Sequence, residues 1–311
     1  MSGIFISGMG AVSPAGWGVE CLRDGDLPEP QAIARPGWKH PLSVRRVPAM
    51  NPRPPWAVHP RMRRSALISQ FAMGAAMEAL SQPADGPLGI VFCTTCGCVN
   101  YSRRFYDEVL HDPAVASPLL FPETVFNAPA SHLSAVLASG AANYTLVGDS
   151  GIFLHGLALA AGWLADGRVT RCLVVAAEEV DWIIADALHH FRKSAILTEG
   201  AGALLLTRER QPDTCAELEY VTDPQPFAAR GGKAVREAAA RRVAAALPAR
   251  TEATFRRSEF DEAFSAGTAW QVLAALRRAQ EQQLSHTTVI APGAYQEAIG
   301  ASFVLSRPIS T

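Results

Sequence analysis

The chain lacks a long apolar run and an excess of charge of either sign. Its 311 residues include 28 basic and 29 acidic side chains, which give a formal net charge of −1. This balance offers no electrostatic attraction to nucleic acid or to an anionic membrane surface. No stretch of about 18 uncharged apolar residues is present, and the N-terminus begins with a strand-like segment rather than a signal peptide. We therefore expect a cytoplasmic protein with no membrane span.

Cysteine is also scarce. Six cysteines form no disulfide framework, which agrees with a reducing compartment. Cys93, Cys96 and Cys98 lie close together, but a closed zinc site needs a second pair of ligands that the sequence does not supply. We interpret these three residues as buried or turn thiols and expect no metal site.

The pattern of apolar residues favours a layered α/β protein. Apolar residues make up 49% of the chain, enough for a large core. Ser65–Leu80 has helical periodicity and precedes a continuous apolar segment at Leu88–Thr94, which indicates a helix followed by a buried strand. Residues 25–60 contain nine prolines and are predicted to be an irregular excursion of the kind that often covers a site or a partner. Further helices and strands are predicted at residues 233–247, 269–283, 287–291 and 303–305.

The most informative segment lies near the middle of the chain. A strand pattern at Asn143–Val147 leads through a short turn into a helical stretch that continues to about Ala165, and a buried-strand pattern follows at Arg171–Ala177. This order predicts one βαβ unit, with Ser150 on the sharp turn between strand and helix. A side chain at this position faces unpaired N–H groups and the positive end of the helix dipole, so nucleophiles are often mounted this way.

Several further segments resemble the β-ketoacyl synthase family of the thiolase superfamily, in the same order along the chain. Residues 4–16, 88–95 and 126–132 are similar to the family's first strand, a later core strand and the segment before the nucleophile strand, and residues 198–206 are similar to its DGAGALVL-type turn. The resemblance implies a thiolase-like fold with α-β-α-β-α layers and a shortened second half. It implies an N-terminal half at residues 1–207, which carries the nucleophile position, and a truncated C-terminal half at residues 208–311, in one compact unit.

The sequence also departs from the family at its catalytic motifs. Ser150 stands where the family has its acyl-accepting cysteine; a cysteine thiolate forms readily at a helix terminus, whereas a serine hydroxyl needs an adjacent base. No HGTGT-like string is present, and the best match to the GHTLG motif places Phe264 where the histidine would be. The GFGGTN loop is replaced by residues 292–302. Both active-site histidines are therefore expected to be missing.

Ser150 allows two interpretations, a helix N-cap or a nucleophile. For a nucleophile, the N–H groups of Gly151 and Ile152 are candidates for an oxyanion hole. The sequence does not place a base beside the hydroxyl. His132 and His155 are candidate pocket residues, although His155 lies about 140° around the helix from Ser150, so a core or interface role is the simpler interpretation for it.

Two functions remain open from the sequence. In the first, the chain resembles the catalytically degenerate chain-length-factor subunits of type II polyketide or aryl-polyene systems, which pair with an active ketosynthase through a strand equivalent to Asn143–Val147. In the second, Ser150 serves an acyltransferase or a thioester hydrolase. Both imply an acidic acyl carrier protein with a phosphopantetheine-linked acyl chain, to which basic clusters such as Arg61–Arg64 would be suited. Self-association as a homodimer is the alternative to a ketosynthase partner, and no other cofactor is expected.

Overall fold

The computed structural model describes residues 3–22, 28–80, 86–228, 232–248, 254–256 and 262–306. The helices are α1 (Leu67–Ala79), α2 (Val99–His111), α3 (Ala128–Val136), α4 (Ile152–Ala165), α5 (Trp182–Phe191), α6 (Gly232–Ala246) and α7 (Phe264–Glu281). The strands are β1 (Phe5–Ser13), β2 (Gly16–Trp17), β3 (Gln31–Ile33), β4 (Leu42–Arg45), β5 (Leu88–Thr94), β6 (Asn143–Val147), β7 (Arg171–Glu178), β8 (Leu197–Thr198), β9 (Gly200–Thr207), β10 (Ala216–Val221), β11 (Gln225–Pro226), β12 (Thr254–Arg256), β13 (His286–Ala291) and β14 (Glu297–Leu305).

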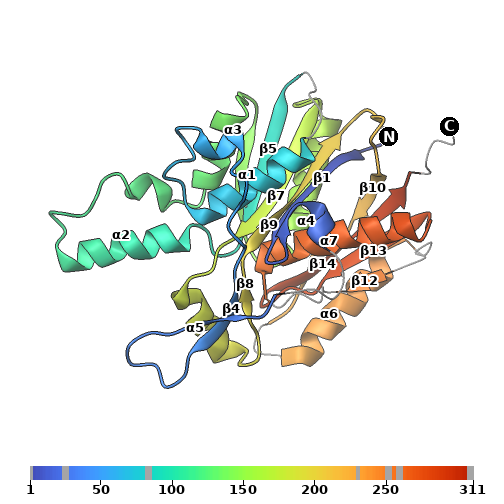
Figure 1. Ribbon diagram of the computed structural model, residues 1–311. Helices are drawn as coiled ribbons and strands as arrows, with labels where there is room; N and C mark the ends of the chain where they lie inside the picture. The colour runs from blue at the N-terminus through green and yellow to red at the C-terminus, as the bar shows by residue number, and fades with distance from the viewer. Residues whose placement is uncertain are drawn as a thin grey trace.

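Within the described residues, one curled sheet runs through the whole molecule (Figure 1). Its main path has the order β12-β13-β14-β10-β1-β9-β7-β5-β6, and β6 lies at one end of that path. The strands before residue 208 and those after it meet where β1 pairs with β10. The site described below lies where helices pack between these two parts of the sheet.

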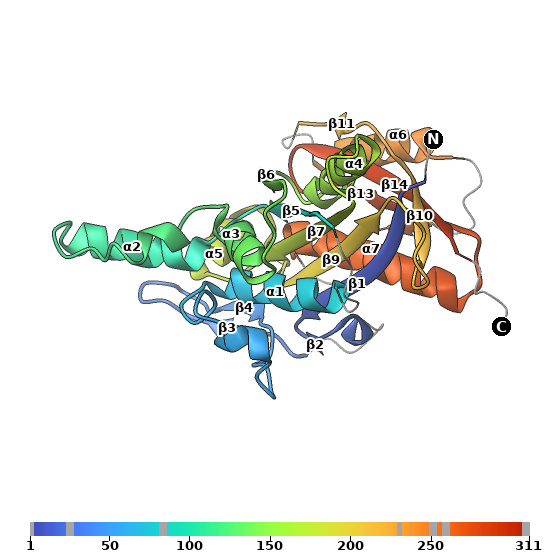
Figure 2. The same cartoon turned by 90° about the horizontal axis from the view of Figure 1, so that it is seen from above.

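Helices and sheet form five layers. On one outer face, α1 and α3 pack against the β1-β9-β7-β5 part of the sheet, and on the other outer face α6 packs against β13 and β14. Between the two parts of the sheet lie α4 and α7, which contact each other and strands from both parts. Figure 2 shows α1 and α4 on opposite sides of the central strands. The α-β-α-β-α layering expected from the resemblance is therefore confirmed.

The sequence produces this layering because the central strands are apolar on both faces. In β7, the alternate residues Cys172, Val174 and Ala176 belong to the core around α4 and α7. Leu173, Val175 and Ala177 belong to the core under α1 and α3. Successive side chains of a strand point to opposite faces, so a continuous apolar run is what a strand covered on both sides requires.

The βαβ unit predicted around Ser150 is present, with one difference. Its two strands, β6 and β7, are parallel but are not neighbours, because β5 lies between them and pairs with both. α4 ends at Ala165, as predicted, and Gly167 follows with a positive φ of 70° that favours glycine at a helix end. The turn that carries Ser150 is therefore held between β6 and the central layer.

Several predicted boundaries differ from the structure. Residues 25–60 are not wholly irregular, because β3 and β4 form a small three-stranded sheet with β8. α7 begins at Phe264 rather than at residue 269, and the last strand begins at Glu297 rather than at residue 303. The helices α2 and α5 were not predicted. α5 is held by contacts with β4, which is far away in the sequence, and α2 has no buried residue.

Candidate active site

Ser150 lies on the turn between β6 and α4, as the sequence predicts. The helix begins at Ile152, with Gly151 before it, and no side chain caps its N-terminus. Ser150 is therefore not the N-cap, and that interpretation is wrong. The N–H of Ile152 donates to the carbonyl of Asp149 at 2.8 Å, so this amide is used inside the turn.

Asp149 joins this turn to the loop that follows β13. Its carboxylate accepts the N–H of Ser150 at 2.7 Å and, from the distant loop, the N–H groups of Ala294 at 2.7 Å, Tyr295 at 3.0 Å and Gln296 at 2.8 Å. Gly293 starts this loop with a φ of 44°, and a Cβ there would lie 2.4 Å from Asp149 Oδ2. The close contact therefore needs glycine at residue 293 and an acid at residue 149.

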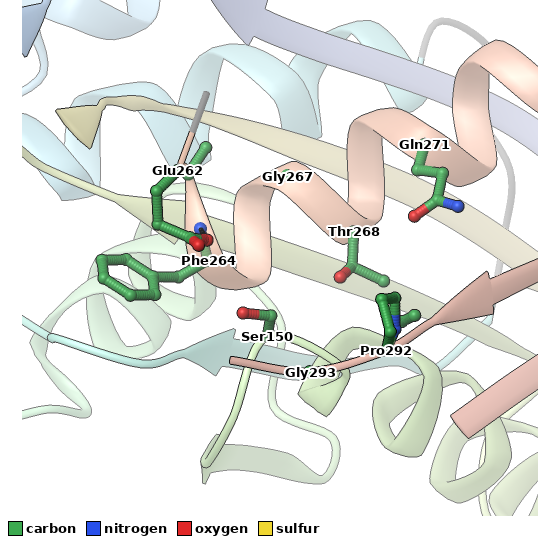
Figure 3. Close-up of a pocket in the computed structure, with 10 residues that line it drawn as sticks. Ser150, Glu262, Phe264, Gly267, Thr268, Gln271, Pro292 and Gly293 are labelled. Carbon is green, nitrogen blue, oxygen red and sulfur yellow. Dashed lines mark hydrogen bonds between the residues drawn. The ribbon is translucent and has the colours of Figure 1, made fainter. Parts of the chain in front are cut away.

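The two loops and the start of α7 enclose a small pocket (Figure 3). Its volume is about 20 Å³, enough for roughly one water molecule. The residues that line it are Ser150, Glu262, Ala263, Phe264, Gly267, Thr268, Gln271, Ala291, Pro292 and Gly293. This lining includes no cysteine and no histidine, and Glu262 is its one titratable side chain.

The hydroxyl of Ser150 has no base in hydrogen-bond contact. The residue is 7% exposed, and its Oγ is buried without a hydrogen-bond partner among the residues that the structure describes. Glu262 is 1% exposed; its carboxylate is paired with the guanidinium of Arg192 and accepts the N–H of Phe264 at 3.1 Å. The acid nearest to the hydroxyl in the pocket is thus engaged with other groups.

A second buried acid fixes the first turn of α7. Glu178, at the end of β7, accepts the hydroxyl of Ser265 at 2.5 Å and the N–H groups of Thr95 and Cys96 at 2.6 and 3.0 Å. Burial raises the pKa of Glu178 to about 7, against these hydrogen bonds, which lower it. In the sequence, Phe264 stands between Glu262 and Ser265. Glu262 accepts the N–H of Phe264, and Glu178 accepts the hydroxyl of Ser265, so the two carboxylates hold the backbone on both sides of the Phe264 ring.

The candidate histidines lie elsewhere and pair with glutamates. His132 Nε2 is 2.9 Å from both carboxylate oxygens of Glu123, and His155 Nε2 is 2.5 Å from Glu297 Oε1. Neither histidine lines the Ser150 pocket. His155 instead ties α4 to β14, just beyond the loop that Asp149 holds.

The clustered thiols lie at the end of β5 and in the turn before α2. Cys93 and Cys98 are buried, Cys96 is half-buried, and burial raises the pKa of each thiol. The prediction of buried and turn thiols is confirmed. Among the described residues, no group of three or more His, Cys, Asp or Glu side chains is placed to hold a metal ion, and no helix is long and apolar enough to cross a membrane.

The family follows from the sequence as a whole. A family model described as Beta-ketoacyl synthase, N-terminal domain, matches residues 38–261, more than half of the chain. The chain belongs to the β-ketoacyl synthase family. Among curated protein sequences, none matches this β-ketoacyl synthase-like chain.

Solved ketosynthase structures share the fold of this family member. The ishigamide ketosynthase/chain length factor has a TM-score of 0.79 at 20% identity, covering 98% of this chain and 100% of that one. A type II PKS acyl-carrier protein in complex with its ketosynthase, AntDE:AntF, gives 0.73 at 15%, with 98% and 100% covered. The ketosynthase ApeO in complex with its chain length factor ApeC, from Xenorhabdus doucetiae, gives 0.72 at 13%, with 98% of each chain covered. At these identities the likeness shows the fold alone.

Proposed function

We propose that this ketosynthase-like chain is the non-condensing partner of an active ketosynthase, a subunit of the chain-length-factor type. The observation that carries the proposal is the Ser150 pocket. Its lining offers no thiol to accept an acyl group and no imidazole to assist decarboxylation, and its volume of about 20 Å³ is far too small for an acyl thioester. The presence of ketosynthase/chain length factor assemblies among the similar folds supports this assignment.

The partner would pair along β6. This strand lies at the end of the sheet, and among the described strands only β5 pairs with it. In the ladder with β5, the carbonyl of Ala142 accepts the N–H of Ile90, and the N–H of Gly148 donates to the carbonyl of Thr94. Backbone groups alternate in direction along a strand of a parallel pair. The N–H and C=O of residues 143, 145 and 147 therefore point outward, away from β5. An exposed edge of this kind is a template for a second chain.

A groove beside β6 and a protruding arm extend this surface. The groove has a volume of about 860 Å³ and lies between α3 and β6. The arm, residues 99–127, contains α2, which has no buried residue (Figure 1). The large apolar side chains that the arm exposes are Tyr106, Leu110, Val115, Leu119, Phe121, Val125 and Phe126. A 13-residue helix is marginal by itself, so a partner that covers this arm would stabilise it.

In such an assembly the role of this chain is steric. The active ketosynthase would perform condensation on an acyl chain carried by the phosphopantetheine of an acyl carrier protein. This chain would supply bulky side chains at a cavity shared by the two subunits. These side chains would set the length at which extension of the acyl chain stops. The carrier protein that accompanies a ketosynthase in one similar structure supports including a carrier among the partners.

The pairing is tested with two substitutions at one residue. Thr145→Pro removes an outward N–H of β6 without removing a hydrogen bond to β5, whereas Thr145→Val keeps the N–H and replaces only a hydroxyl that has no partner. The tagged chain is purified from its host and the complex is identified by mass spectrometry. We expect an equimolar complex with a β-ketoacyl synthase that has a cysteine in its acyl-accepting turn, kept by Thr145→Val and lost by Thr145→Pro. Pairing along β6 with a second copy of this chain in place of a ketosynthase, or a ketosynthase complex that survives Thr145→Pro, would contradict the proposal.

The second candidate function is acyl transfer or thioester hydrolysis by Ser150. One observation favours it: Glu262 is a buried acid in the same pocket and could serve as a base if Arg192 released it. Incubation with a panel of acyl-pantetheine thioesters, followed by intact-mass analysis, separates the two functions. We expect no adduct; an adduct on Ser150 that Ser150→Ala abolishes would establish the acyltransferase or hydrolase instead.

A further inference from the structure

The buried hydroxyl of Ser150 is an unusual feature of the site. An unpaired buried polar group costs about 1–3 kcal/mol, so such a group needs an explanation. Within the described part of the chain its Oγ has no hydrogen-bond partner, and the pocket beside it has room for about one water. The space that an acyl thioester would need beside this hydroxyl is therefore occupied by protein.

Phe264 lies in that space at the cost of backbone strain. Its φ is 44°, in the left-handed region, which costs a non-glycine residue about 1–2 kcal/mol. The residue is the first of α7 and lines the pocket with Ser150. Figure 3 shows the ring of Phe264 beside the hydroxyl of Ser150, under the first turn of α7.

Contacts on three sides hold Phe264 in this conformation. Its N–H is bound by Glu262, and the next residue, Ser265, is bound by Glu178. Its side chain belongs to an apolar cluster that includes Val44 of β4 and Leu188 of α5. Because two buried acids and an apolar cluster fix one residue, its strained conformation is maintained by the surrounding fold.

We propose that Phe264 is a plug that closes the Ser150 pocket to acyl thioesters. Residue 150 stands on the strand-to-helix turn, and Asp149 holds the opposite loop in place. The inference concerns this pocket alone and does not depend on a partner subunit, so its failure and the failure of the pairing proposal are separate results.

The plug is tested with a thiol reporter. Ser150→Cys is prepared alone and with Phe264→Ala or Phe264→Leu, and each protein is incubated with iodoacetamide and with hexanoyl-pantetheine. Modification of residue 150 is followed by peptide mapping, which separates it from the six native cysteines. Phe264→Leu is included because Phe264→Ala alone can lower stability by about 3–5 kcal/mol.

We expect residue 150 of the Ser150→Cys protein to be modified slowly. Truncation of Phe264 should accelerate this modification at least about tenfold, because access of the reagent to the thiol limits the rate. Leu133→Ala creates a cavity in a separate core cluster and controls for global unfolding. Combined with Ser150→Cys, it should leave the rate of modification of residue 150 unchanged. Circular dichroism and thermal melting establish that the compared variants are folded. Rapid labelling of Ser150→Cys with Phe264 intact would overturn the proposal, as would a folded Ser150→Cys/Phe264→Leu protein that reacts no faster than Ser150→Cys.

Discussion

Asp149 is the residue that joins the two loops of the site. Its substitution by alanine would leave the N–H groups of Ala294, Tyr295 and Gln296 without their acceptor. Partly buried amides left unpaired lower the free energy of unfolding, here by about 3 kcal/mol. Urea unfolding measures the change, with Asp166→Ala as the exposed control, for which we expect a change within about 0.5 kcal/mol. Equal effects of the two substitutions would show that other contacts hold the loop.

Two buried glutamates make stability depend on pH. Burial raises the pKa of both Glu178 and Glu179 from 4.5 to about 7. Between pH 4.5 and 7 the folded state therefore binds more protons than the unfolded state, and the stability this provides is lost as the pH rises through 7. We expect the melting temperature to rise on acidification from pH 8 to pH 6. Glu178→Gln should flatten this dependence, whereas Glu219→Gln, on the exposed side of β10, should leave it unchanged. The same slope in both variants would assign the pH dependence to other groups.

At the residue scale, the sequence predicted the place of Ser150 but not its surroundings. The place follows from a local pattern, an apolar strand, a glycine-flanked turn and a helix. The partners of Asp149 lie about 145 residues further along the chain, and Glu262 reaches the pocket only through the packing of α7. No local periodicity encodes such contacts, so the clamp of Asp149 and the acid beside Ser150 were missed.

Elements were predictable where their apolar pattern was unambiguous. Buried residues recur along α4, and β7 is buried almost throughout; the positions of both elements agree with the prediction. α2 was missed; it has no buried residue, and its side chains Tyr106 and Leu110 are exposed. The start of β14 was missed because Glu297 pairs at the edge of the site loop, where a turn was expected. Sequence periodicity therefore located the buried helices and strands of the layers better than it located α2 and the start of β14.

The packing of α4 on the sheet depends on a glycine at one position of the helix. A Cβ at Gly156 would lie 2.6 Å from Cys93 Sγ and 2.9 Å from Val174 Cγ1, whereas a Cβ at Gly162 meets nothing within 4 Å. Gly156→Ala should therefore lower the free energy of unfolding by about 2 kcal/mol through overpacking. Gly162→Ala, on the same helix, should raise it by about 1 kcal/mol through helix propensity. Chemical denaturation of both variants tests this, and a stabilising Gly156→Ala would mean that α4 can shift away from β5 and β7.

At the scale of the whole molecule, exposed apolar side chains gather on the arm and on β6. Tyr144 and Val147 of β6 are 57% and 51% exposed, and Leu110 and Leu119 of the arm are 71% and 69% exposed. Contiguous exposed apolar surface marks an interaction site. The arm precedes α3 and β6 along the chain, and the proposed partner would cover the outer edge of β6.

This arrangement predicts how the chain behaves without its partner. The isolated protein should self-associate through the arm, and the double substitution Leu110→Ser with Leu119→Ser should weaken that association at least about tenfold, because each leucine loses apolar burial worth more than 1 kcal/mol. The melting temperature should hardly change, since both side chains are exposed in the monomer. Phe191→Ser is the matched control: its side chain is 88% exposed but lies on α5, outside the arm. Sedimentation velocity over a range of concentrations distinguishes the variants, and equal weakening by Phe191→Ser would assign the association to general hydrophobicity rather than to the arm.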